Sequence, residues 1–430
     1  MIEFDSNKNE HISILLFGGL LDETQEVELD YVYKSGVKEG LNKKKKITIT
    51  TRINGLSLIP HSDWITKKPG VYQTNEEVLN LIAKGKPKLD AVKIANLLLK
   101  IRELNKLLST YYYSVESYID ENDLRIRPQF SHCGYEIYNS VGGGTKTARL
   151  SCTKPNLQNQ PNGIVKEHFV SRWYSNGNLI SADYSQIEVR VQAWLSNDLN
   201  FIKDIINGVD FHIKYLSFST GKSYESLVYE IVDKKNETWI AARSKIKGFT
   251  FSRAFGAGVK RIAIASGLTE QEVKRIIEKD QIEYPRLHLW KAWLQETVNT
   301  EGFYKNPFNR IYKFKKYKAA PWKQEKGIME DYSYNEIINH QVQGFTFDIV
   351  LMMIGQFWRK CAILNRDKYL MINTVHDSLM LDCKKEYEED AKIDLGFLEN
   401  VQEILLDQLD YRFNMPTPID IKVGRNWSEI

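Results

Sequence analysis

The segment DYSQIE at residues 183–188 constrains the fold more than any other part of this chain. The apolar run 179–182 before it predicts a buried strand, and the apolar spacing from Ile187 to Leu195 after it predicts a helix. An aspartate at a strand end is a fixed anionic ligand for Mg²⁺, which commonly takes only one or two carboxylates. A lone aspartate here is more often a helix cap or a turn residue. The rest of the chain therefore has to decide the role of Asp183.

A second aspartate stands in matching surroundings. Residues 370–381 form two short apolar runs around His376 and Asp377, which predicts a β-hairpin with this dipeptide at its tip. Beside the first strand, such a hairpin would let Asp183 and Asp377 hold two metal ions about 3.5–4 Å apart, as in-line displacement at phosphorus requires. The alternative is an ordinary polar turn, in which Asp is a standard residue.

A stripe of charged and aromatic side chains lies between the two aspartates. Arg243, Lys247, Phe251 and Phe255 recur at every fourth position, so a helix would carry them on one face. Two cations followed by two rings suit a nucleoside triphosphate, with cations on the phosphates and rings against sugar and base. From spacing alone, an amphipathic helix with a phenylalanine pair in the core is the favoured alternative.

The three segments, in this order, resemble motifs A, B and C of the family A DNA polymerases, the bacterial DNA polymerase I type. The resemblance extends to residues 147–159 ahead of motif A, to 339–349 before motif C, and to 423–427 near the end of the chain. It implies an α+β right-hand polymerase fold, with an antiparallel-sheet palm, helical fingers and a helical thumb.

The resemblance also implies a division into domains. The expected thumb is 1–120, the palm is split into 121–200 and 335–430, and the fingers are 201–334. These boundaries would bring Asp183 and Asp377 together across the whole fingers domain.

Within the expected thumb, residues 11–17 predict a short helix and 27–53 a lysine-rich hairpin. Residues 89–119 predict a long helix with an apolar stripe. Because Met1 lies almost at the first of these helices, we expect no 3′–5′ exonuclease domain. The compact thumb with its lysine-rich hairpin resembles phage polymerases more than bacterial ones.

The function that the resemblance implies is template-directed DNA synthesis. Deoxynucleoside triphosphates would be added to a primer 3′-hydroxyl by two-metal-ion nucleotidyl transfer, without intrinsic proofreading. Asp183, Asp377 and the Tyr184 carbonyl would hold two Mg²⁺ ions, for which Mn²⁺ is an expected substitute. Arg243 and Lys247 match the residues that grip the phosphates, and Lys247 is also the expected proton donor to pyrophosphate.

Further side chains match positions that contact the substrates. The expected nucleotide contacts, besides Arg243 and Lys247, are Gln186, Glu188, His212, Phe251 and Phe255. The expected contacts to the primer-template are Arg149, Asn339, Gln343 and His376. Glu188 matches the family's steric gate, which crowds the 2′ position and so favours deoxynucleotides over ribonucleotides. A lone histidine such as His212 is more often structural.

Three positions depart from the family pattern. Phe255 stands where the family commonly has tyrosine, so a hydroxyl contact to Glu188 is lost. Ser378 stands where motif C usually has glutamate, which removes a carboxylate near the metal site. Asn335 stands where an arginine is common on the template side. We expect looser control of sugar or mismatch and modestly weaker metal binding, with activity retained.

Composition agrees with this interpretation. The formal net charge of +4 requires basic residues to gather on one surface for nucleic acid binding. Lys43–Lys46 is one such candidate, although a solvated hairpin edge explains it equally well. The cysteines show no CxxC spacing, which disfavours a zinc site and suits a reducing compartment; they are Cys133, Cys152, Cys361 and Cys383.

The expected partners are primer-template DNA and deoxynucleoside triphosphates, with a separate exonuclease or processivity factor as a further candidate. Without a secretion signal or a membrane-length apolar run, we expect a cytoplasmic protein, in the host cytoplasm if it is phage-encoded. Two other functions remain open: a non-catalytic primer-template binding subunit and a single-subunit RNA polymerase. Glu188 argues against ribonucleotide use, and the intact Asp183, Asp377, Arg243 and Lys247 argue against a decayed site. A two-metal nuclease fits the aspartates but not the stripe from Arg243 to Phe255.

Overall fold

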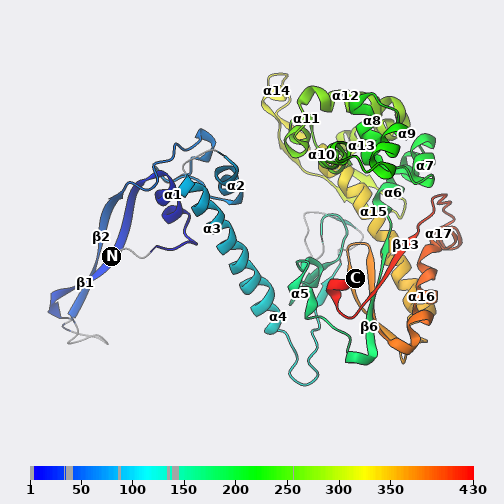
Figure 1. Cartoon of the computed structure of the whole chain (residues 1–430), viewed down its shortest axis with the longest axis horizontal. Helices are drawn as coiled ribbons and strands as arrows, with labels where there is room; N and C mark the ends of the chain where they lie inside the picture. Colours follow the sequence, from blue (N-terminus) through cyan, green and yellow to red (C-terminus); the bar gives the residue numbers. More distant parts are fainter. Residues whose placement is uncertain are drawn as a thin grey trace. The chain divides into compact units, whose positions relative to one another are not determined.

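The computed structural model describes residues 4–32, 34, 42–85, 89–132, 136–137, 145–254 and 256–430. The chain forms two compact units, Met1–Ile119 and Asp120–Ile430 (Figure 1). Each unit has its own apolar core, and the predicted catalytic residues all belong to the second unit.

The first unit packs three helices beside a long hairpin. Helices α1 (Asn9–Phe17), α2 (Glu76–Lys84) and α3 (Leu89–Lys106) enclose its small core. Strands β1 (Gly19–Val32) and β2 (Asn42–Ile53) pair antiparallel. The hairpin therefore starts at Gly19, eight residues before the predicted start, because its first strand pairs outward from Gly19 opposite Ile53.

Two lysines of this hairpin face glutamates on the neighbouring strand. Lys44 and Lys46 lie 4.0 and 3.9 Å from Glu28 and Glu26, and all four side chains are exposed. These ion pairs neutralise part of the candidate phosphate-binding patch. The geometry therefore favours the solvated hairpin edge over a phosphate-binding surface.

The long helix of the first unit differs from its prediction in burial. After α3 the chain continues through a π-helical segment (Leu107–Tyr112) into α4 (Tyr113–Glu116). Only the amino-terminal part of α3 packs into the core, through Ala91, Ala95 and Leu98. Leu97 and Leu104 on the predicted apolar stripe are exposed. Leu97 lies on the face of α3 turned away from the core, and Leu104 lies in the part of the helix that extends beyond the core.

The second unit is built on a four-stranded antiparallel sheet in the order β11-β12-β6-β13. The strands are β6 (Gly177–Tyr184), β11 (Tyr369–Val375), β12 (Ser378–Lys384) and β13 (Ile419–Gly424). Side chains alternate between the two faces of a strand. Ile180 and Ala182 belong to the main core with α6 (Ile187–Ser196) and α15 (Tyr334–Phe357), so Ser181 and Asp183 face the opposite side.

A cluster of helices forms a second core within this unit (Figure 1). Its main members are α8 (Phe211–Thr220), α10 (Glu237–Ala254), α11 (Val259–Ser266) and α12 (Glu270–Glu283). Helix α13 (Pro285–Glu301) contacts α12 but buries its apolar residues in the main core. Apolar residues such as Leu216, Phe249 and Ile276 are buried between α8, α10 and α12. Helix α13 also packs on α6 and α15, which ties the cluster to the sheet.

The remaining elements are short and connect these layers. The helices are α5 (Ile164–Glu167), α7 (Leu199–Ile206), α9 (Tyr224–Val228), α14 (Pro321–Gln324), α16 (Glu388–Leu395) and α17 (Val401–Leu409). The strands are β3 (Gln129–Ser131), β4 (Glu136–Ile137), β5 (Ser151–Thr153), β7 (Phe303–Lys305), β8 (Ile311–Lys313), β9 (Lys316–Lys318) and β10 (Glu330–Tyr332).

Two findings bear on the expectations from composition. Cys152, Cys361 and Cys383 are free thiols, while Cys133 lies outside the described residues. Among the helices of the described ranges, none combines the length and apolar character needed to cross a membrane.

Two glycines on α15 give a matched test of its packing. A Cβ on Gly344 would stand 1.9 Å from the buried Tyr312 hydroxyl oxygen, whereas one on Gly355 would meet only the Arg359 side chain at 4.0 Å. We expect Gly344→Ala to lower the free energy of unfolding by about 1–3 kcal/mol through overpacking. Gly355→Ala should raise it by about 0.5–1 kcal/mol, because alanine favours a helix. Urea denaturation measures both, and equal effects would contradict the packing described here.

Candidate functional site

The hairpin of β11 and β12 lies against β6 and brings the two predicted metal-binding aspartates together. Ser378 pairs with Asp183 across the two strands, and the Tyr184 amide lies 3.5 Å from the Asp377 carbonyl oxygen. On the other side of β6, Asp420 of β13 pairs with Asp183. His376, at the hairpin tip, has a φ of 56°, a left-handed conformation that closes the turn. Asp183 therefore lies between Ser378 and Asp420, with Asp377 one residue beyond Ser378.

Burial raises the pKa of both aspartates, and the charge of Asp377 adds to the rise at Asp183. Partial burial, and then the negative charge of Asp377, raise the pKa of Asp183 to about 6, while Lys422 opposes the shift. Burial also raises the pKa of Asp377, against the attraction of Arg149 and His376. Within the described ranges, neither carboxylate forms an ion pair, so a bound cation would relieve their repulsion.

The carboxylates of Asp183 and Asp377 suit a metal ion that takes its remaining ligands from water or a substrate. In the part of the chain that the structure describes, no three His, Cys, Asp or Glu side chains gather closely enough to hold an ion alone. Mg²⁺ sites commonly use one or two carboxylates and take the remaining ligands from water and substrate phosphates. The pair Asp183 and Asp377 meets this pattern.

The turn after β6 positions the first residues of α6. Gln186 precedes the helix with a φ of 53°, and Arg190 holds the turn by donating to the carbonyls of Ser185 (2.8 Å) and Pro416 (3.0 Å). One residue into the helix, the Glu188 carboxylate forms an ion pair with Arg149. Burial raises the pKa of Glu188, Arg149 opposes the rise, and Asp377 adds to it. Glu188 is thus fixed by a guanidinium close to the aspartates.

The predicted phosphate-binding side chains gather between α8 and α10. Arg243 donates to Asp210 through Nε (3.0 Å) and Nη2 (2.5 Å), and His212 Nδ1 lies 2.9 Å from the Thr250 hydroxyl. Burial is the main cause that lowers the pKa of His212, and the charges of Arg243 and Lys247 lower it further against Asp210. His212 on α8 therefore lies close to Arg243 and Lys247, which α10 carries one turn apart.

Sequence reasoning missed Asp210, which caps α8 by accepting from the His212 and Ile213 amides. Burial raises the pKa of Asp210, but hydrogen bonds from Arg243 and the Ile213 amide outweigh it and leave the pKa lowered. An acidic residue two positions before His212 was the available signal, because aspartate is a preferred helix cap.

A cavity of about 720 Å³ joins these groups. Its lining includes Gln186, Glu188, His212, Arg243 and Asp377, which come from four separate segments of the chain. The volume falls within the range of small-molecule and cofactor sites, about 300–1,000 Å³. The lining thus combines carboxylates with a guanidinium and an imidazole, a set of groups that suits a metal-bound polyphosphate.

Comparison with known proteins identifies the family. The model of the DNA polymerase family A matches residues 48–429, most of the chain. The protein belongs to DNA polymerase family A. It is 26% identical to the thermostable DNA polymerase I of Thermus filiformis over 371 residues, which cover 85% of this chain and 39% of that protein. It is 27% identical to the DNA polymerase I of Caldicellulosiruptor bescii, over 85% of this chain and 38% of that one. The chain thus spans about two fifths of the length of these curated relatives.

A solved structure shows the same fold. The POL domain of Pol1 from M. smegmatis, in complex with DNA primer-template and dNTP, superposes with a TM-score of 0.61 at 19% identity. The match covers 84% of this chain and 57% of that one. The α+β right-hand polymerase fold expected from the sequence is confirmed.

The residues predicted to contact the primer-template lie on three elements of this family A chain. Asn339 and Gln343 stand one turn apart on α15 and are half-buried. His376 is exposed at the hairpin tip, and Arg149 is held by Glu188. The described structure gives the two amides no hydrogen-bond partner, so they are available to a ligand. Their roles stay predictions.

Three other predicted positions need separate mention. Phe255 and the Phe251 side chain lie outside the described residues, so the aromatic half of the stripe stays a prediction. Asn335 packs beside Gly256, where its Oδ1 would lie 3.0 Å from an added Cβ. The asparagine therefore occupies the space next to the carboxyl end of α10.

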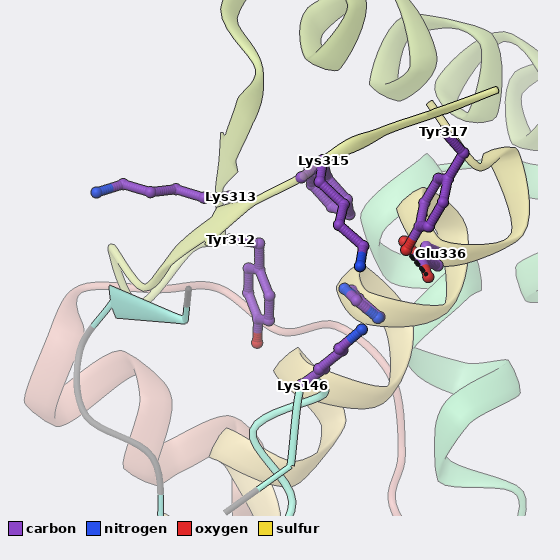
Figure 2. Close-up of a pocket in the computed structure, with 8 residues that line it drawn as sticks. Lys146, Tyr312, Lys313, Lys315, Tyr317 and Glu336 are labelled. Carbon is purple, nitrogen blue, oxygen red and sulfur yellow. Dashed lines mark hydrogen bonds between the residues drawn. The ribbon is translucent and has the colours of Figure 1, made fainter. Parts of the chain in front are cut away.

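A small basic hollow lies on the same helix as Asn339 (Figure 2). Lys146 and Lys315 point toward one another, whereas Lys313 points away, and Tyr317 donates to Glu336 at 2.7 Å. His340 also lines the hollow, and its burial lowers its pKa to about 4, with Lys146 adding to the effect against Glu336. Sequence reasoning missed this hollow, although lysines alternating with aromatics at 312–318 were a visible signal.

The raised pKa of Asp183 predicts a stability that depends on pH. Because the folded pKa of about 6 lies above the ordinary 3.8, ionising this carboxylate costs free energy only in the folded state. This destabilisation is absent at low pH and grows as the pH rises from about 4 to 6. We expect Asp183→Asn to raise the Tm of the metal-free protein above pH 6 and to leave it unchanged near pH 4. Thermal melts in a chelator measure this, and an equal change at both pH values would contradict it.

Proposed function

We propose that this protein copies DNA, adding deoxynucleoside triphosphates to a primer 3′-hydroxyl as the template directs. Membership of DNA polymerase family A supports this proposal. The observation that carries it is the strand register that sets Asp377 beside Asp183 at a cavity lined by Arg243 and His212. The relatives named above are DNA polymerases I, and the M. smegmatis domain holds primer-template and dNTP.

Asp183, Asp377 and the Tyr184 carbonyl are the proposed holders of two Mg²⁺ ions, with Mn²⁺ as a substitute. When bound, the ions would lower the pKa of the primer hydroxyl and neutralise charge on the triphosphate. The two carboxylates are suited to this task because they repel each other and form no ion pair within the described residues. Ser378 replaces the usual glutamate on one side of Asp183, and Asp420 adds a negative charge on the other side.

The proposed phosphate-binding group, called the Arg243 grip below, consists of Arg243, Lys247 and His212. Arg243 is held by Asp210 and so presents its guanidinium from a fixed position. A triphosphate would compete with Asp210 for this guanidinium and would also attract Lys247. Lys247 is the proposed donor of a proton to the pyrophosphate leaving group. Gln186, Phe251 and Phe255 remain the proposed contacts to the rest of the nucleotide.

Glu188 is the proposed barrier against ribonucleotides. The ion pair with Arg149 holds its carboxylate in place without the tyrosine hydroxyl that Phe255 lacks. Arg149, Asn339, Gln343 and His376 are the proposed contacts to the primer-template. Amides and guanidinium groups donate to minor-groove acceptors that every base pair carries, so they test geometry without reading sequence.

The domain roles follow from the same proposal. The first compact unit would act as the thumb, the four-stranded sheet with α15 as the palm, and the helices from α7 to α13 as the fingers. A non-catalytic primer-template binding subunit is the competing function. A binding subunit would not need two neighbouring carboxylates whose repulsion destabilises the fold.

Primer extension on a defined template with Mg²⁺ separates these two functions. We expect the wild type to extend the primer and Asp377→Ala to reduce the rate by roughly 10³-fold or more, because a metal ligand supplies several kcal/mol. Asp407→Ala, which removes an exposed aspartate from α17, is the matched control and should keep full activity. Fluorescence anisotropy should give unchanged primer-template affinity in both variants. Tight binding without extension by the wild type would favour the binding subunit.

Sugar selection gives an independent test. We expect Glu188→Ala to lower the discrimination between deoxynucleotides and ribonucleotides by about 10- to 100-fold, measured as a ratio of kcat/KM values. Glu188→Gln keeps the size of the side chain and loses only the ion pair with Arg149. If bulk excludes the 2′-hydroxyl, the glutamine variant should discriminate nearly as well as the wild type. Unchanged discrimination in the alanine variant would remove Glu188 from this role.

A further inference from the structure

Lys291 is a buried cation that the proposed reaction does not use. It stands on α13, is 5% exposed, and lines the same cavity as Glu188 and Arg243. In the described part of the chain, its ammonium forms neither a hydrogen bond nor an ion pair. Burial and the charge of Arg253 lower its pKa to about 8, against the attraction of Asp280. A buried ammonium without a partner is costly, so its position invites a ligand.

Arg253 on α10 is the second cation at this place. Its Nε lies 3.7 Å from Asp280 Oδ2, is buried, and makes no hydrogen bond within the described residues. Its Nη2 lies 3.4 Å from His288 Nδ1. Because arginine can only donate, Nδ1 has to accept and the His288 proton has to lie on Nε2. The Arg253 guanidinium thus retains donor capacity toward the cavity that it lines.

Asp280 on α12 is the nearby carboxylate, and its acceptor capacity is largely used. Its Oδ1 accepts from Tyr215 at 3.0 Å, and its Oδ2 accepts from His288 Nε2 at 2.9 Å. Burial raises the pKa of Asp280, but His288 and Arg253 outweigh it and leave the pKa lowered, so one negative charge faces two cations. Arg190 on α6 also lines the cavity but donates to backbone carbonyls. The wall between α10 and α13 therefore carries an excess of positive charge.

We propose that Arg253 and Lys291 form a binding subsite for a phosphate-type dianion, separate from the Arg243 grip. A guanidinium and an ammonium that converge on one cavity match the oxygens of a tetrahedral oxyanion. Arg253 follows Arg243 by ten positions on α10, so the two subsites lie toward opposite ends of that helix. An anion here would link α10 to α13 through two charge-assisted contacts.

The source of the dianion rests on the proposed function. Pyrophosphate, the product of DNA synthesis, is an oxyanion of this class that the site would meet in every turnover. Free inorganic phosphate shares the chemistry. Binding of the oxyanion itself depends only on Arg253 and Lys291, so it is tested without DNA.

Sulfate is the first probe, because its double charge stays constant over the pH range of interest. The full chain is labelled with ¹⁵N-histidine, and the resonances are assigned through His288→Gln and His212→Gln. The His288 ring reports on the proposed subsite, and the His212 ring reports on the Arg243 grip. We expect both rings to shift and saturate in the wild type at about pH 7.

Lys291→Met is the deciding variant, because it replaces a buried charge with an apolar side chain of similar length, a change that is often neutral or stabilising. In this variant, the sulfate affinity reported by the His288 ring should fall at least about tenfold, while the affinity reported by the His212 ring should not change. Lys274→Met removes an exposed lysine from α12 and is the matched control, with both responses retained. An unchanged His288 response in Lys291→Met, an equal loss in Lys274→Met, or no response in the wild type would overturn the proposal.

Two further measurements distinguish anion binding at the subsite from a change in packing and from an effect on DNA synthesis. Sulfate affinity at His288 should fall as the pH rises through about 8 in the wild type, where Lys291 loses its proton, and this slope should vanish in Lys291→Met. Pyrophosphate titrations on the same samples identify the source: binding tighter than phosphate supports the product, and equal binding assigns free phosphate. Primer extension by the wild type is measured in parallel, so failure of synthesis and failure of the subsite are seen separately.

Discussion

The register of β12, β6 and β13 is the constraint on which the site depends. Ile180 and Ala182 bury one face of β6 in the main core, and a slip of one residue would turn that face to solvent. The same register fixes Asp183 beside the hairpin that carries Asp377. Apolar packing on one side of the sheet thus holds two like charges together on the other. Core burial supplies the free energy that their mutual repulsion opposes.

Around this pair, two guanidinium groups are held in ion pairs with carboxylates that line the cavity. Arg149 is paired with Glu188, and Arg243 is paired with Asp210. Each guanidinium is therefore held in position by its carboxylate, and under the proposed function a bound anion would take the place of that carboxylate. Lys291 differs, because it is buried without such a partner in the described structure. Arg149 and Arg243 therefore already have an anionic partner, whereas the proposed anion would be the first such partner of Lys291.

Much of the fold and part of the site could be predicted from the sequence, because these features are local. The strand before Asp183, the hairpin around Asp377 and the helix with Arg243 all follow from periodicity over a few residues. The hairpin of the first unit starts earlier than predicted, because strand pairing rather than alternation sets its length. Leu104 on the predicted apolar stripe of α3 is exposed, because a helix can extend past the core that it joins. Periodicity does not reveal where a core ends.

The sequence by itself determined the residue types, their spacing and the family, and with these the chemistry that the site can perform. Only the tertiary structure decided which charges meet. Asp420 joins Asp183, Asp210 takes Arg243, and Arg253 and Lys291 face one cavity from two helices. These contacts connect positions far apart in the chain, and their strength depends on burial and distance, neither of which a linear spacing contains.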